Sequence, residues 1–117
     1  MSYMFFGCTS LVSVNTTDWD TSNIDSTTYM FYYCNKLESL NISNFNLNSN
    51  VDVSYMFSTV TKLYEINAEN CNETTLEVLI NALPSMTSSK KGVINTKTST
   101  DNLISLASEK YWNIFKI

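Results

Sequence analysis

The chain has 117 residues, a formal net charge of −4 and no histidine, and only 15% of its side chains are charged. The length predicts a single domain, and the lack of histidine removes the commonest general base and most zinc arrangements. We therefore expect no enzyme, no cofactor and no metal. There is also no long apolar run to span a membrane and no basic stripe to bind nucleic acid.

A motif that begins with Met-Phe occurs three times. The copies begin at Met4, Met30 and Met56, so each starts 26 residues after the one before (30 − 4 and 56 − 30). A fixed period in the twenties is typical of a solenoid, in which one short unit stacks on copies of itself. We therefore predict that the core is formed between the copies, since one unit cannot bury its own apolar side.

Each copy changes its hydrophobic period halfway along. Met30, Cys34 and Leu37 are spaced as on one face of a short helical turn. The following stretch alternates apolar residues around Asn41, which is a strand pattern. We predict a mixed α/β solenoid of leucine-rich-repeat type, with short helical turns alternating with parallel strands. Residues of the Leu40 type should face inward and the asparagines outward.

The repeat ends near residue 73. Thr74-x-x-Glu77 fits a capping box, and helical spacing with a terminal proline follows at Leu76, Leu79, Ile80, Leu83 and Pro84. A strand over 92–96, a short helix near 103–107 and a strand starting at Trp112 complete the pattern. We predict three repeats in residues 1–72 and a C-terminal helix-strand cap in 73–117, because the last repeat of a stack would otherwise expose apolar surface.

The first residues match the end of a repeat. Ser2-Tyr3 corresponds to Thr28-Tyr29 and Ser54-Tyr55, so the chain opens in mid-repeat. Two interpretations follow. Either the natural protein continues upstream, with any secretion signal located there, or this end is left for a partner. We expect an open N-terminal edge in this chain, which stacks on an upstream repeat in the first case and on another chain, as in self-association, in the second.

The three cysteines allow two interpretations. Cys8 and Cys34 hold the same position in neighbouring copies and should stack about one strand spacing apart, roughly 5 Å, which is compatible with a disulfide. However, ladder positions point in parallel, and buried cysteine behaves as a small hydrophobe. We favour free core thiols there and also at Cys71.

The candidate site is the outward face of the predicted strands. Polar residues recur there in each copy: Ser13, Asn15, Thr17, Ser39, Asn41, Ser43, Glu65, Asn67 and Glu69. This set is either a solvated face whose amides bond along the stack or a recognition surface, because solenoids commonly bind through their sheets. Asn15, Asn41 and Asn72 also begin glycosylation sequons.

Several tyrosines lie outside the main apolar positions. Tyr32, Tyr33 and Tyr64 are the examples. Exposed tyrosine is favoured in protein interfaces, and partial burial against the neighbouring turn is the alternative.

The repeated residues resemble the BspA-like leucine-rich repeats of surface proteins. That family's motif runs Met-Phe-x-x-Cys-x-x-Leu-x-x-Leu-x-(Leu/Ile)-Ser-x-Phe-(Asp/Asn)-Thr-Ser-x-Val. The copy over 30–45 follows it closely, Asp20-Thr21-Ser22-Asn23-Ile24 matches its tail, and the stretch after residue 76 looks like the family's usual terminal module. The third copy departs, with Val60 in place of cysteine and Cys71 in place of the aromatic residue.

This resemblance implies an extracellular or cell-surface adhesion role. Its partners would be a host or cell-surface protein, the extracellular matrix or a glycan. An alternative class is a structural assembly element, such as a phage or appendage fibre module, that stacks through its open N-terminal edge. Fold similarity does not choose between them, because function resides in the particular surface.

Overall fold

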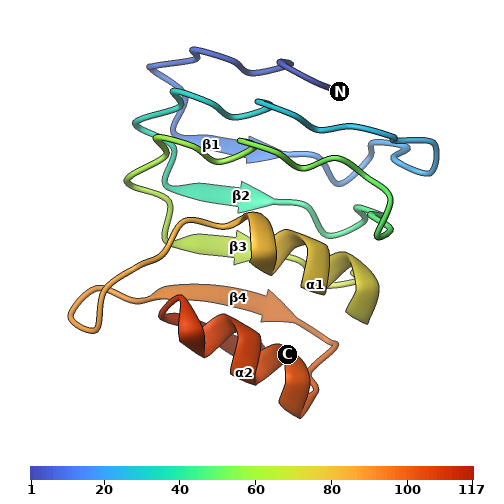
Figure 1. Ribbon diagram of the computed structural model, residues 1–117, viewed down its shortest axis with the longest axis vertical. Coiled ribbons are helices and arrows are strands. Elements are labelled where there is room, and N and C mark those ends of the chain that lie inside the picture. The colour runs from blue at the N-terminus through green and yellow to red at the C-terminus, as the bar shows by residue number, and fades with distance from the viewer.

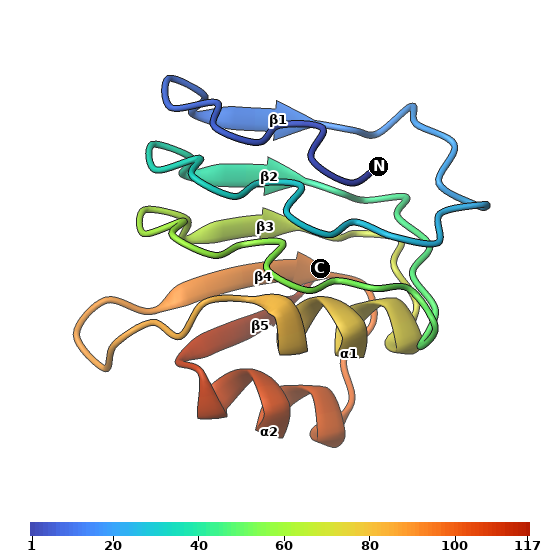
Figure 2. The same cartoon turned by 45° about the horizontal axis from the view of Figure 1, so that its top comes forward.

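The fold is mixed α/β, with one open five-stranded parallel sheet and two helices. The computed structural model describes residues 1–117. The strands lie in chain order across the sheet (Figures 1 and 2; β5 is labelled in Figure 2): β1 (Ser13–Asn15), β2 (Ser39–Asn41), β3 (Glu65–Asn67), β4 (Gly92–Thr96) and β5 (Trp112–Lys116). Helices α1 (Glu73–Ala82) and α2 (Asp101–Glu109) lie on one side of the sheet, in the same layer as the segments that precede the first three strands (Figures 1 and 2).

The 26-residue period sets the register of the first three strands. Leu40 pairs with Val14 on one side and with Ile66 on the other, so equivalent residues of successive copies lie level. Leu40 and Ile66 are buried, while the neighbouring Asn41 and Asn67 are half-buried on the other face. The predicted parallel sheet, with its apolar positions inward, is therefore confirmed.

The short helical turns predicted after each Met-Phe pair are wrong. Tyr29 and Tyr33 have φ angles of 58° and 63°, in the left-handed region. The equivalent residues of the other copies do the same, at Tyr3, Gly7, Tyr55 and Thr59. A left-handed residue cannot continue a right-handed helix. The segment is instead a run of tight turns, which reproduces the helical spacing of the apolar residues without being a helix.

Backbone donors in these turns alternate between two kinds of acceptor. The N–H groups of Met30 and Tyr32 donate to Thr27 and Tyr29 within their own turn, at 3.0 and 3.2 Å. Between them, the N–H of Phe31 donates to the carbonyl of Met56 in the next copy, at 3.0 Å. Every second N–H therefore ties one copy to the following one, in a layer that has no strand.

Burial increases from the first copy to the second. Met30, Phe31, Cys34 and Leu37 are fully buried, whereas Met4 is 48% exposed and the other equivalents in the first copy are half-buried. Three phenylalanine rings, one per copy, stack through this core, with Phe31 between Phe5 and Phe57 at centroid distances of 5.4 and 5.6 Å. The first copy thus covers the second but is covered on one side only.

All three cysteines are free, as favoured from the sequence. The Cys34 thiol donates to the Phe5 carbonyl at 3.0 Å, and the Cys71 thiol donates to the Ile42 carbonyl at 3.2 Å. Both thiols therefore reach back to the preceding copy as buried donors. Burial raises the pKa of both, to about 11 for Cys71.

Helix α1 begins two residues earlier than the capping box predicted. The side chain of Asn72 accepts a hydrogen bond from the Thr75 backbone N–H at 2.8 Å and is the N-cap, so Thr74 lies inside the helix. Asparagine is at least as good an N-cap as threonine, and Thr75 is then free to bond the Leu47 backbone from the core. The helix ends before Pro84, as predicted.

The residues after α1 extend the same sheet. Strands β4 and β5 continue the parallel register beyond β3, and α2 contacts β5 and α1. Lys110 binds the C-terminal end of α1 by donating to the carbonyls of Asn81 and Leu83, both at 2.8 Å. Neither helix has the length and apolar character needed to cross a bilayer. The division into repeats and cap at residue 73 stays a prediction.

Phe31→Ala should lower the free energy of unfolding by about 3–5 kcal/mol, because it removes a fully buried ring. Phe5→Ala is the matched control and should cost less, since Phe5 holds the same position in the less buried first copy. Urea unfolding measures both. Equal losses would show that the first copy is as well packed as the second.

Cys71 should make stability depend on alkaline pH. Its folded pKa of about 11 lies above the usual 9.0, so the unfolded chain loses the thiol proton first. The contribution of Cys71 to the free energy of unfolding is therefore at its maximum below pH 9.0 and falls as the pH rises toward 11. Cys71→Ser keeps a donor without a titrating thiol. Its unfolding free energy should fall less steeply over that range than the wild type's, and parallel curves would contradict the assignment.

Candidate binding face

The outward face of β1–β3 contains a shallow hollow of about 230 Å³. Its lining consists of the predicted strand residues and two backbone neighbours: Ser13, Val14, Asn15, Ser39, Leu40, Asn41, Glu65 and Asn67. The register places Asn15, Asn41 and Asn67 level with one another across the three strands. The strand residues proposed from the sequence therefore do lie together.

The other three candidates lie in the turns that follow the strands. Ser43 is buried, so its prediction as an outward residue is wrong. Its hydroxyl turns back to donate to the Asn41 side chain at 2.6 Å, which draws it beneath the asparagines. Thr17 is half-buried and donates to Asn15 in the same way. Glu69 forms an ion pair with Lys97 at 2.9 Å.

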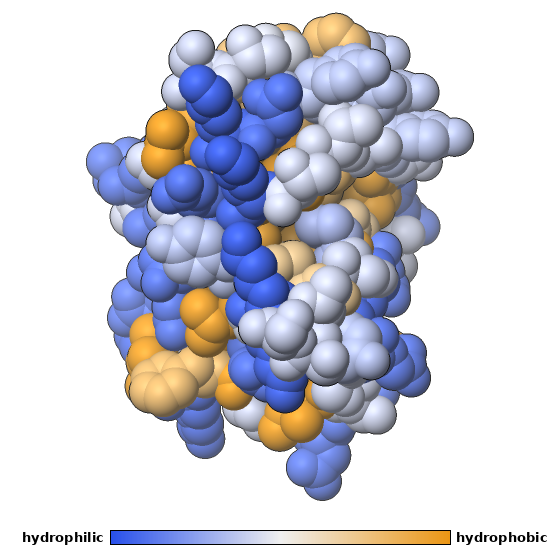
Figure 3. Space-filling view, turned by 90° about the vertical axis from the view of Figure 1, so that its left-hand side faces the viewer, coloured by the Kyte–Doolittle hydropathy of each residue, from blue (hydrophilic) through white to orange (hydrophobic).

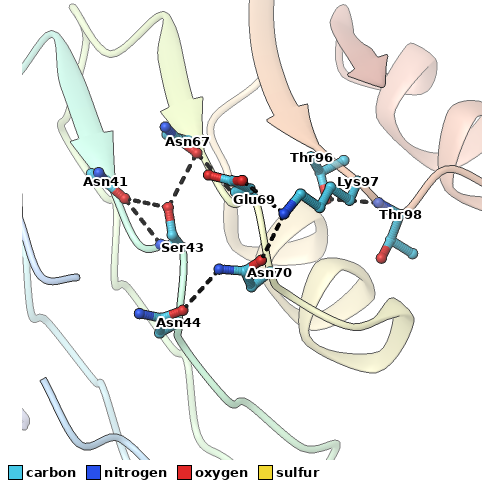
Figure 4. A network of polar contacts seen from close by, with 9 residues as sticks. All are labelled: Asn41, Ser43, Asn44, Asn67, Glu69, Asn70, Thr96, Lys97 and Thr98. Atoms are coloured by element: carbon cyan, nitrogen blue, oxygen red, sulfur yellow. Dashed lines mark hydrogen bonds and ion pairs between the residues drawn. The ribbon is translucent and has the colours of Figure 1, made fainter. Parts of the chain in front are cut away.

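Each asparagine side chain has a structural use for its oxygen. The Oδ1 atom of Asn41 accepts the Ser43 backbone N–H at 3.1 Å, and the Oδ1 atoms of Asn15 and Asn67 accept the equivalent N–H groups of Thr17 and Glu69. These are Asx-turns, which stabilise the chain's exit from each strand. Figure 4 shows the oxygens of Asn41 and Asn67 directed into the turns.

This arrangement leaves the amide nitrogens free. A backbone N–H donor fixes which amide atom faces the turn, so the Nδ2 groups point the other way, as Figure 4 shows for Asn41 and Asn67. None of the three Nδ2 groups donates a hydrogen bond within the molecule. Neighbouring strands lie about 4.8 Å apart, so the hollow has three parallel donors at that interval, beside the Glu65 carboxylate.

A second polar row beside the first is a finding of the structure. Asn44 donates to the Thr17 carbonyl at 2.6 Å, and Asn70 donates to the Asn44 side chain at 3.1 Å. Lys97 lies 3.5 Å from the Asn70 oxygen and continues the row (Figure 4). The signal was present in the sequence, because Asn44 and Asn70 stand 26 residues apart (70 − 44). This row uses its amides internally.

Two exposed carboxylates outside the hollow, those of Asp20 and Asp52, accept hydrogen bonds within turns. Hydrogen bonds from Ser22 lower the pKa of Asp20, and hydrogen bonds from Ser54 lower the pKa of Asp52. No three side chains among cysteine, aspartate and glutamate lie close enough together to hold a metal ion.

Of the tyrosines singled out in the sequence, two are exposed and one is partly buried. Tyr33 and Tyr64 are exposed, while Tyr32 is half-buried. A stacked column of Tyr3, Tyr29 and Tyr55 also runs along the turn layer, with ring centroids 5.1 and 4.9 Å apart.

The turn role and the free donor of Asn41 can be separated by substitution. Asn41→Ala removes the acceptor for the Ser43 N–H and should lower the free energy of unfolding by about 1 kcal/mol. Asn41→Asp keeps an oxygen acceptor but lacks the Nδ2 donor, so its stability should lie closer to that of the wild type. Chemical denaturation measures both variants. Equal losses would mean that the Asx-turn is not what Asn41 stabilises.

Comparison with known proteins identifies the family of this chain. Neither the curated proteins nor the solved structures contain a match to the chain. The family model described as "Mycoplasma protein of unknown function, DUF285" matches residues 1–100. These residues include all three copies, the hollow and the first four strands. The chain therefore belongs to the DUF285 family.

Proposed function

We propose that this chain is a non-enzymatic binding module of an extracellular or cell-surface protein. In this proposal the repeats are of the BspA-like, leucine-rich type and stack as a solenoid whose sheet face binds a host or cell-surface protein. The level pairing of successive copies supports the stacking. The buried leucines Leu37 and Leu63, at equivalent positions of neighbouring copies, support the leucine-rich assignment.

The observation that carries the binding role is the row of three free amide donors. An asparagine needed only for its turn could be replaced by aspartate, because both residues favour Asx-turns. Asparagine at all three positions adds an uncharged donor to the hollow. Carbonyl groups of a protein partner accept such donors, and Ser13 and Ser39 supply hydroxyl groups beside them.

The test replaces only the donors. The triple variant Asn15→Asp, Asn41→Asp and Asn67→Asp keeps each turn acceptor and should lose binding to immobilised extracellular-matrix proteins that have been stripped of their polysaccharides. Its control adds the same charge at exposed asparagines outside the hollow, namely Asn23→Asp, Asn50→Asp and Asn113→Asp. The control should bind as the wild type does. Equal binding by both variants would contradict the proposal.

A second function, assembly through the N-terminal edge, is favoured by a separate observation. In the second copy, the carbonyls of Thr28, Met30, Tyr32 and Asn41 accept N–H groups from the first copy. The equivalent carbonyls of the first copy, those of Ser2, Met4, Phe6 and Asn15, accept none from within the chain and belong to exposed residues. The turn layer at this end is therefore a row of acceptors beside exposed apolar side chains.

The polarity of that row limits what can stack there. A second copy placed face to face would bring acceptors against acceptors in the turn layer, so the fitting occupant is a repeat that offers N–H donors. Light scattering of the purified chain should accordingly show a monomer. A dimer that Met4→Ser with Phe6→Ser abolishes would favour pairing through this edge instead.

A further inference from the structure

A column of lysines runs along the edge of the molecule at which the strands begin. Lys36 and Lys62 are 26 residues apart (62 − 36) and stand three residues before the paired Ser39 and Glu65. Glu65 also pairs with Val93, which places Lys90 level with Lys62. Figure 3 views this edge and shows hydrophilic side chains in a near-vertical column. This column is a finding of the structure, because the pairing of β3 with β4 brings Lys90 beside Lys62.

The charges of this lysine column are not neutralised by ion pairs. Lys97–Glu69 is the one salt bridge of the chain, and it lies at the opposite ends of the strands. Lys36, Lys62, Lys90 and the adjacent Lys91 are all exposed. Four of the seven basic side chains thus gather on one edge of a chain whose net charge is −4. A local field of this kind attracts anions despite the sign of the whole.

The column contains a hollow of about 280 Å³, separate from the one on the sheet face. Lys62 and Lys90 line it together with Tyr64 and Glu38. Tyr64 is 43% exposed, so part of its surface is available to a ligand. The hollow therefore combines two ammonium groups, an aromatic ring and a carboxylate.

We propose that this hollow and the lysine column bind an acidic polysaccharide. The ammonium groups would pair with its sulfate or carboxylate groups, the Tyr64 ring would pack against a sugar ring, and Glu38 would accept sugar hydroxyls. The level spacing of Lys36, Lys62 and Lys90 suits a linear polymer that lies across the strands. Glu38 disfavours DNA, because a phosphodiester backbone would bring negative charge and no hydroxyl donor to that carboxylate.

The experiment measures binding of dextran sulfate, with neutral dextran as the uncharged control, over a range of salt concentrations. Wild-type protein should bind dextran sulfate with an affinity that falls as salt rises, and should not bind dextran. Lys62→Gln with Lys90→Gln should weaken binding about tenfold or more and reduce the salt slope by about two, one for each lost contact. The matched control, Lys97→Gln with Lys116→Gln, should change affinity by less than about twofold.

Tyr64 separates sugar recognition from simple ion exchange. Tyr64→Ala should weaken dextran sulfate binding while leaving the salt slope unchanged, because it removes no charge. The sheet-face triple aspartate variant should still bind dextran sulfate. The test of this site therefore does not depend on whether the sheet face binds a protein. Equal effects of the two lysine pairs, no binding by the wild type, or tighter binding to duplex DNA or anionic vesicles would each overturn the proposal.

Discussion

The alternation of backbone hydrogen bonds in the turn layer is the constraint on which the structure depends. Because Tyr29 and Tyr33 adopt left-handed conformations, successive N–H groups in the segment between them donate alternately to the same copy and to the next copy. Neighbouring copies are thereby held at the spacing of sheet strands in a layer without strands. Left-handed conformations of residues other than glycine cost about 1–3 kcal/mol each, so the stacked phenylalanines and the bonds between copies must offset that cost.

This constraint also gives the stack a direction. In the turn layer, the N–H groups that leave a copy donate to the following one, which leaves acceptors at the N-terminal end of that layer. At the other end the turn layer is replaced by α1 and α2, and the Lys110 side chain satisfies carbonyls at the end of α1. The two faces of a copy are therefore chemically different, and this difference separates directional stacking from symmetrical pairing.

Much of the fold could be predicted from the sequence because a period of 26 fixes which residues lie level. That period gave the inward Leu40 and Ile66 and the row of asparagines beside them. The turn conformation could not be predicted, because the spacing of Met30, Cys34 and Leu37 fits a helix and a run of tight turns equally well. The cap of α1 was misplaced because Asn72 competes with Thr74 and also leaves Thr75 free for the core.

The candidate surfaces show the same limit. The strand asparagines were found from the sequence. That each Oδ1 atom accepts a turn N–H while each Nδ2 group stays free depends on the Asx-turns, which only the geometry reveals. The lysine column was missed because Lys90 lies outside the repeat, and only the pairing of β3 with β4 places it beside Lys62. Residues that belong to no repeat can thus complete a surface that the repeat begins.

The most direct measurement is the scalar coupling across the hydrogen bond donated by the Phe31 amide, observed by nuclear magnetic resonance. We expect a coupling from the Phe31 nitrogen to the carbonyl carbon of Met56, the acceptor in the next copy. A helical turn would instead join Phe31 to Thr27, four residues earlier. Detection of that coupling in place of the one to Met56 would contradict the alternating bonds and the stacking that depends on them.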